Sequence, residues 1–129
     1  MTPLWKKRKR KADFVSLAEK TCEPCRGGTP PLTRSQFEPL LGELKDWQVE
    51  KDCKLKKIYK TRDFMESHTL ANRIAEIAEQ QGHHPDLLVR WGELVVDIWT
   101  HKIDGLSEAD FILAAKIDRL SANQMDRCC

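Results

Sequence analysis

The sequence predicts an α+β fold in which a four-stranded antiparallel sheet carries three helices packed on one face. Two observations lead to this fold class. Two pairs of apolar segments rich in β-branched and aromatic residues are each joined by a short turn, which is typical of antiparallel hairpins. Helical periodicity occurs before, between and after these hairpins. The resulting order, α-β-β-α-β-β-α, suits one layer of helices on an antiparallel sheet.

The first helix and the first hairpin follow one another directly. Thr33 or Ser35 provides the N-cap of a short helix that continues to about Leu44. Two strands come next, over residues 47–49 and 55–59, joined by a polar turn. Their alternation of apolar and polar residues is imperfect, so the sequence leaves their register open.

The clearest helical signal begins at a capping box formed by Asp63 and Glu66. We expect the helix to end at Gly82, because glycine readily takes the left-handed conformation that follows a helix. One apolar stripe recurs between these ends at helical spacing: Leu70, Ala71, Ile74, Ile77 and Ala78. The sequence therefore predicts an amphipathic helix that covers the sheet.

The second hairpin and the last helix complete the fold. Residues 87–91 and 94–99 are predicted to be antiparallel strands joined at Gly92 and Glu93. A second capping box, begun by Ser107 and closed by Asp110, starts the last helix. Its apolar face consists of three residues at helical spacing: Leu113, Ile117 and Leu120.

The 129 residues are enough for one domain with a modest core. We interpret residues 1–31 as a basic, flexible leader and residues 32–129 as a single domain. Residues 1–30 contain eight Lys and Arg against three Asp and Glu, whereas the rest contains 14 against 17. The slightly acidic domain makes nucleic acid an unlikely partner. The basic run over residues 6–11 is compatible with a nuclear address, an anion-binding arm or a solvated start.

Composition also limits the cellular setting. No apolar run approaches the roughly 18 residues of a membrane span, and the basic start lacks the apolar segment of a signal peptide. We therefore expect a soluble, cytoplasmic protein whose five cysteines are reduced. Cys22-x2-Cys25 is compatible with half of a zinc site, a redox pair or a leader that packs on the domain.

Histidines gather where the predicted helix and strands end. His83 and His84 follow the long helix directly, Pro85 keeps them out of helical conformation, and His101 follows the last strand. Imidazoles titrate near neutral pH, so this grouping favours proton-transfer chemistry. Asp110 has two readings, as a carboxylate in the site and as the third helical residue of a capping box.

Together these residues form the pattern Glu79-x3-His83-His84-Pro85-x5-Trp91-x9-His101-x8-Asp110. This pattern, with Gly105-Leu106-Ser107 before the aspartate, resembles the pterin-4a-carbinolamine dehydratase family over about residues 32–120. The resemblance implies a cofactor-free lyase that dehydrates a 4a-hydroxy-tetrahydropterin in tetrahydrobiopterin recycling. It also implies a pterin substrate and assembly into homodimers through sheet edges, or into homotetramers.

The same resemblance assigns roles to the residues that match the pattern. His83, His84 and His101 are the expected catalytic residues, and we expect their rings in one pocket with Asp110 at its rim. The substrate-binding set is Glu79, Pro85, Trp91 and Asp110. Of the other tryptophans, Trp99 is expected in the core rather than in contact with the substrate.

Other interpretations carry less weight. We expect no metal, because adjacent histidines in extended backbone point in diverging directions and cannot easily bind one ion. A binding module that acts as a dimerisation cofactor and transcriptional coactivator is the alternative function, since animal members of the resembled family have that role. A zinc-organised interaction domain built on the cysteines is the third.

Overall fold

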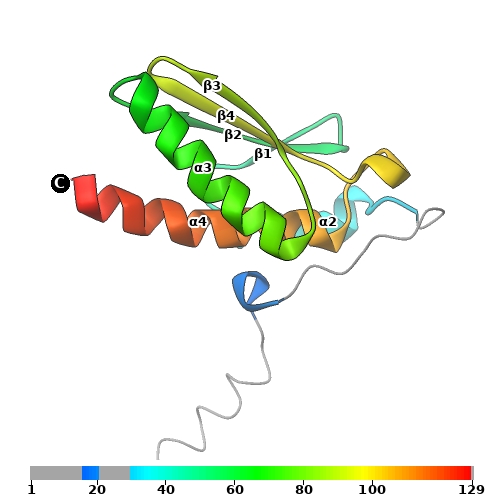
Figure 1. Ribbon diagram of the computed structural model, residues 1–129. Helices are drawn as coiled ribbons and strands as arrows, with labels where there is room; N and C mark the ends of the chain where they lie inside the picture. Colours follow the sequence, from blue (N-terminus) through cyan, green and yellow to red (C-terminus); the bar gives the residue numbers. More distant parts are fainter. Residues whose placement is uncertain (1–15, 21–29, 129) are drawn as a thin grey trace, which may run out of the picture.

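We describe the fold from a computed structural model, which describes residues 16–20 and 30–128, with side chains to residue 120. Three helices, α2 (Arg34–Leu41), α3 (Phe64–Gln81) and α4 (Glu108–Cys128), lie on one side of the sheet (Figure 1). The four strands are β1 (Gln48–Glu50), β2 (Lys54–Lys60), β3 (Asp86–Arg90) and β4 (Glu93–Ile98). Two short 3-10 turns, η1 (Leu17–Glu19) and η2 (His101–Ile103), complete the described elements. The predicted fold class is confirmed.

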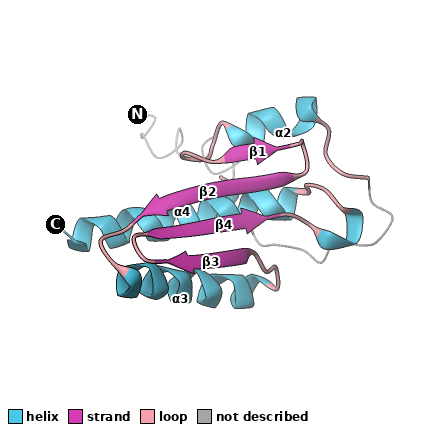
Figure 2. Cartoon of the chain, turned by 90° about the horizontal axis from the view of Figure 1, so that it is seen from above, coloured by secondary structure: helices cyan, strands magenta, loops and turns pink. Residues whose placement is uncertain are grey.

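The sheet is antiparallel throughout, with strand order β1-β2-β4-β3 (Figure 2). Val49 of β1 pairs with Leu55 of β2, which fixes the register that the sequence left open. Leu55 also pairs with Ile98 of β4. In β4, Leu94, Val96 and Ile98 are each fully buried and face the helices. The edge strands β1 and β3 have one strand neighbour each among the described residues.

The N-termini of α2 and α3 form where the sequence signals predict them, whereas α2 ends at Leu41 and not at about Leu44. The Asp63 side chain accepts a hydrogen bond from the Glu66 backbone N–H at 2.8 Å and so caps α3. At the first helix, the Thr33 backbone N–H donates to the Gln36 side chain at 2.8 Å, which is half of a capping box. These bonds satisfy backbone groups that have no partner inside the helix.

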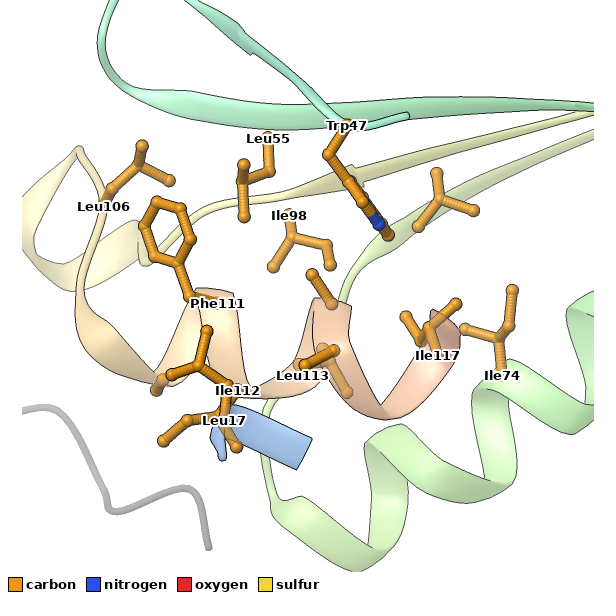
Figure 3. Packing of buried hydrophobic residues seen from close by; sticks show 14 of the residues in the cluster. Leu17, Trp47, Leu55, Ile74, Ile98, Leu106, Phe111, Ile112, Leu113 and Ile117 are labelled. Carbon is orange, nitrogen blue, oxygen red and sulfur yellow. The ribbon is translucent and has the colours of Figure 1, made fainter. Parts of the chain in front are cut away.

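The core lies between the helices and the sheet (Figure 3). Phe37 of α2 stacks on Phe111 of α4, with ring centroids 6.1 Å apart. A buried ion pair joins Lys57 of β2 to Asp118 of α4 at 2.8 Å, and Asp118 also accepts the indole N–H of Trp47. This ion pair connects α4 to the sheet within the core. The hydrogen bonds that Asp118 accepts offset part of the free-energy cost of burying the two charges.

Leu17 of η1 belongs to the core, within a segment that the sequence predicts to be part of a flexible leader. Leu17 is 2% exposed and packs beside Ile112 of α4 (Figure 3). Lys20 also pairs with Glu108 at 2.9 Å. Burial of the apolar Leu17 side chain against α4 stabilises the position of η1. The basic run over residues 6–11 and the Cys22–Cys25 pair lie outside the described residues.

None of the described helices is long and apolar enough to cross a membrane.

Candidate active site

The C-terminus of α3 positions the first two histidines. Gly82 takes the left-handed conformation with φ 64°, and its N–H donates to the Glu79 carbonyl at 3.2 Å. The next N–H, from His83, donates to the Ala78 carbonyl at 3.1 Å. This pair of bonds is a Schellman motif, which ends the helix and turns the chain sharply. His83 and His84 therefore leave α3 in a fixed direction before β3 begins.

A buried carboxylate forms a hydrogen bond with the ring of His83. Its Nε2 lies 2.5 Å from Oδ1 of Asp110, whose side chain is fully buried. The other oxygen, Oδ2, accepts hydrogen bonds of 2.8 Å from the Thr100 hydroxyl and from the Ser107 backbone N–H. An ionised carboxylate only accepts hydrogen bonds, so Nε2 of His83 donates. Nδ1 is then the ring nitrogen left for a ligand.

Asp110 combines the two readings that the sequence offered for it. Its bond to the Ser107 N–H is the capping-box bond of α4, and its bond to His83 reaches the site. The structure corrects its position, since Asp110 lies beneath the pocket and not at the rim. The reason is that all the bonds of this carboxylate run to groups of the protein itself, which surround it completely.

His84 has a carboxylate partner of a different kind. Its Nε2 lies 2.8 Å from Oε1 of Glu79, one turn before the end of α3. Both side chains are more than half exposed, at 60% and 78%. Solvent screens this pair, so it orients the ring without a large contribution to stability.

His101 reaches the site from the end of β4. It opens η2, in a loop that a pair of backbone bonds between Thr100 and Gly105 closes. Its ring stacks on Trp99, with centroids 4.2 Å apart and an angle of 9° between the planes. Gly105 is required in this loop, because a Cβ there would lie 2.6 Å from Cβ of Pro31.

The histidines from these two segments meet in one pocket of about 410 Å³. The residues that line it come from the α3–β3 connection and from the end of β4: Gly82, His83, His84, Pro85, Asp86, Trp99, Thr100, His101 and Lys102. A pocket of this size, with a few polar groups, suits a small organic molecule.

Trp91 does not join the pocket, although the pattern places it in the substrate-binding set. It lies in the turn between β3 and β4 and is 73% exposed. β3 ends at Arg90, which pairs with Glu93, so Trp91 and Gly92 form the turn one residue earlier than predicted. The five residues of β3 then separate Trp91 from the pocket by about 16 Å.

Sequence reasoning overlooked several residues around the histidines. Trp99 was expected in the core, but it lines the pocket and stacks on His101, although it also packs on the core cluster. The alternation of β4 carries the signal, because a side chain after the buried Ile98 points to the opposite face. Thr100 was overlooked as a partner of Asp110, whereas the bond from the Ser107 N–H was predicted through the capping box. Asp86 and Lys102 complete the lining.

A carboxylate pair lies next to the pocket on the helix-free face of the sheet. Asp97 of β4 is directly opposite Asp86 of β3. Burial raises the pKa of the Asp97 carboxyl above its ordinary value, whereas the nearby Lys56 and Lys54 lower it by a smaller amount. The ionised form of Asp97 is therefore disfavoured where it sits. Among residues 16–20 and 30–120, no three His, Cys, Asp or Glu side chains gather to hold a metal ion.

The fold and the pocket define a small α+β protein with a site of three histidines, two of them backed by carboxylates. Residues 30–120 match the family model of pterin 4 alpha carbinolamine dehydratase. The chain is 56% identical over 106 residues to a putative pterin-4-alpha-carbinolamine dehydratase of Rickettsia bellii, covering 81% of this chain and 94% of that protein. The Rubrobacter xylanophilus protein of the same description is 47% identical over 104 residues, covering 81% and 97%. The chain therefore belongs to the pterin 4 alpha carbinolamine dehydratase family.

Solved structures agree with this assignment. The crystal structure of a transcriptional coactivator/pterin dehydratase from Brucella melitensis superposes with a TM-score of 0.64 at 27% identity. The match covers 70% of this chain and 97% of that one. A pterin dehydratase-like protein described as a RuBisCO assembly factor of the alpha-carboxysome has a TM-score of 0.50 at 18% identity, over 61% and 93% of the chains. At that identity the second likeness shows the fold alone.

Proposed function

We propose that this chain is a hydro-lyase that dehydrates a 4a-hydroxytetrahydropterin in the recycling of tetrahydrobiopterin. One observation carries the proposal: imidazoles from two separate segments, His83–His84 and His101, line a single pocket. The names of the relatives supply the substrate class, since those from Rickettsia bellii and Rubrobacter xylanophilus are both putative pterin-4-alpha-carbinolamine dehydratases.

The reaction requires proton transfer at two places. The C4a–O bond breaks and the hydroxyl leaves as water, so this oxygen must receive a proton. The N5–H bond also breaks, and the nitrogen electron pair forms the C4a–N5 double bond of quinonoid dihydropterin. No electrons enter or leave, so acid and base groups are sufficient. Positioned side chains of this kind typically accelerate proton transfer about 10²- to 10⁴-fold.

The contacts support a division of roles. We assign proton transfer to His101 and, of the two adjacent histidines, to His83, whose side chain is 14% exposed and held by a buried carboxylate, against 60% exposure for His84. His84, held by Glu79 at the exposed mouth, binds and orients the pterin. Asp110 is a positioning residue, since it reaches the reaction through His83.

A dehydratase assay on the purified protein tests the proposal. A 4a-hydroxytetrahydropterin is supplied, and formation of the quinonoid product is compared with the spontaneous rate. We expect clear acceleration by the wild type and loss of most of it in His83→Ala and His101→Ala. His68→Ala is the matched control, because His68 is exposed on α3 and does not line the pocket. A wild-type rate equal to the spontaneous rate would overturn the proposed function.

A homo-oligomer is part of the proposal. The edge strands β1 and β3 present backbone groups that a second copy could pair with, and an unpaired edge favours such association. Light scattering after size exclusion gives the mass directly, and a monomer at micromolar concentration contradicts this part alone.

A coactivator role is the second candidate, because the Brucella melitensis structure is described as both coactivator and dehydratase. Co-purification of a transcription factor from the source cell, unaffected by His83→Ala, would support that role independently of turnover.

A further inference from the structure

His101 differs from the other two histidines in how it is held. His83 is hydrogen-bonded to Asp110, and His84 to Glu79. Within the described part of the chain, the His101 ring makes neither a hydrogen bond nor an ion pair, and its defined partner is the indole of Trp99. His101 is also exposed, so its orientation depends on that contact.

We infer that Trp99 and Lys54 are positioning residues that fix the plane of the His101 imidazole for proton transfer. This inference rests on the proposed function and adds two residues to its machinery. The stack is nearly parallel, at 9° with centroids 4.2 Å apart. A face-to-face contact restrains the ring plane, yet it leaves both ring nitrogens at the edge free to reach a ligand.

The indole of Trp99 is itself held from a neighbouring strand. Nζ of Lys54 lies 4.5 Å from the centre of the Trp99 ring, within the distance of a cation–π interaction. The register explains this contact, because the pairing of Leu55 with Ile98 brings the preceding Lys54 beside the following Trp99. Trp99 also packs against the hydrophobic core. Lys54 of β2 therefore contacts the indole of Trp99, and the indole in turn contacts the ring of His101.

Lys54 makes this inference testable apart from ligand binding. Trp99 lines the pocket, so its replacement alters both the support of His101 and the pocket wall. Lys54 is not among the residues that line the pocket. Because Lys54 also lowers the pKa of the nearby Asp97 carboxyl, a double-mutant cycle with Trp99 decides whether its effect on turnover passes through the indole. A cation–π contact at a partly exposed position contributes about 0.5–1 kcal/mol, which corresponds to about two- to fivefold in rate.

The experiment measures kcat, KM and melting temperature for single variants. Lys54→Met keeps the aliphatic stem and removes the charge, and we expect kcat to fall two- to fivefold with KM unchanged. Lys54→Arg keeps a cation for the indole and should retain the wild-type kcat. Lys60→Met is the matched control, since Lys60 lies at the other end of β2 and pairs with Glu93. It should leave kcat unchanged.

A double-mutant cycle then tests whether Lys54 acts on His101 through Trp99. Trp99→Leu should lower kcat about tenfold, and Trp99→Phe should recover part of the loss because it restores an aromatic face. If Lys54 acts through the indole, Lys54→Met should have no further effect on kcat in the Trp99→Leu background. Additive losses would overturn the inference, as would a Lys54→Met enzyme with wild-type kcat.

A spectroscopic readout separates positioning from packing. The His101 ring protons should resonate upfield in the wild type, because they lie over the indole face. We expect this shift to vanish in Trp99→Leu and to shrink in Lys54→Met, with the melting temperature of Lys54→Met lowered by no more than about 5 °C. An unmoved His101 resonance in Lys54→Met would overturn the inference. A wild type without dehydratase turnover would instead overturn the proposed function, whatever the resonances show.

Discussion

His83 and His101 line the same pocket, but His83 is fixed from the interior of the protein and His101 from its surface. The side chain of His83 is 14% exposed and is bonded to a fully buried carboxylate that belongs to the first turn of α4. His101 is exposed and rests on Trp99, which a strand lysine covers. Both arrangements orient an imidazole, yet they depend on different forces.

The difference predicts how each side responds to change. Around Asp110 the removal of one group leaves several buried donors without an acceptor, which is costly in a low-dielectric interior. On the His101 side, removal of Lys54 or of the imidazole loosens a contact at the surface, whereas Trp99 itself also packs on the core. Substitutions on the His83 side should therefore affect folding and turnover together, whereas those of Lys54 and His101 should affect mainly turnover.

The largest effect is expected for Asp110→Ala. Loss of the carboxylate leaves His83, Thr100 and Ser107 without their acceptor. The free energy of unfolding should fall by about 3 kcal/mol, and the melting temperature by on the order of 10 °C. Turnover should fall about 10²- to 10⁴-fold. Calorimetry and the dehydratase assay measure the two quantities.

Two further variants make this prediction decisive. Asp110→Asn keeps the shape of the side chain, so it should fold more stably than Asp110→Ala and still lose most turnover. Glu108→Ala removes an exposed carboxylate from the same helix turn, where the salt bridge to Lys20 contributes no more than about 1 kcal/mol. Its turnover should stay at the wild-type level. A folded Asp110→Asn enzyme with normal turnover would falsify the positioning role of Asp110.

Substitutions of the adjacent His83 and His84 should differ in their effects on kcat and KM. If His83 transfers a proton as proposed, His83→Ala should lower kcat about 10²-fold or more. His84→Ala should mainly raise KM, since the exposed His84–Glu79 pair contributes to binding. Steady-state kinetics on both variants decide the assignment. A raised KM with unchanged kcat in His83→Ala would reverse the two roles.

A smaller effect is expected at Asp97, on the sheet face beside the exposed side of the pocket. Its folded-state pKa lies above the unfolded value because the carboxyl is partly buried. The folded protein thus binds the proton of Asp97 more tightly than the unfolded chain does. The ionised carboxylate lowers the free energy of unfolding above the folded-state pKa, and this loss disappears as the pH falls below that pKa. Asp97→Asn should raise stability at neutral pH by at most about 0.5 kcal/mol. This gain should shrink as the pH falls toward 4, when melting curves are compared across that range. A gain independent of pH would contradict the prediction.

The smallest effect, none, is expected for deletion of residues 1–11. This segment has six consecutive basic residues and no apolar periodicity, and the pocket is lined by residues far from it in the sequence, between Gly82 and Lys102. Turnover and oligomeric state should match the full chain. Leu17→Ala is the contrasting variant, because loss of a buried leucine costs about 2–5 kcal/mol. A loss of turnover in the deletion, with the circular dichroism spectrum preserved, would assign the basic run a part in the site.

The sequence by itself determined the order of elements and the ends of α3. The capping aspartate Asp63 and the terminating Gly82 act through backbone geometry within a few residues, so their effect is readable locally. The same locality explains why His83, His84 and Pro85 were expected in a turn after the helix. The grouping of His101 with them came from resemblance to a family, since no local rule joins residues that far apart.

Only the tertiary structure decided which groups contact and orient each imidazole. The bond from Asp110 to His83 joins α4 to the end of α3, and the contact of Lys54 with Trp99 depends on the register of β2 against β4. A shift of one residue in that register would place Lys54 on the other face of the sheet. Trp91 likewise lies outside the pocket because it follows β3, and the length of this strand separates it from the α3–β3 connection that lines the pocket. Contacts of this kind depend on packing between elements distant in the chain, which residue patterns do not encode locally.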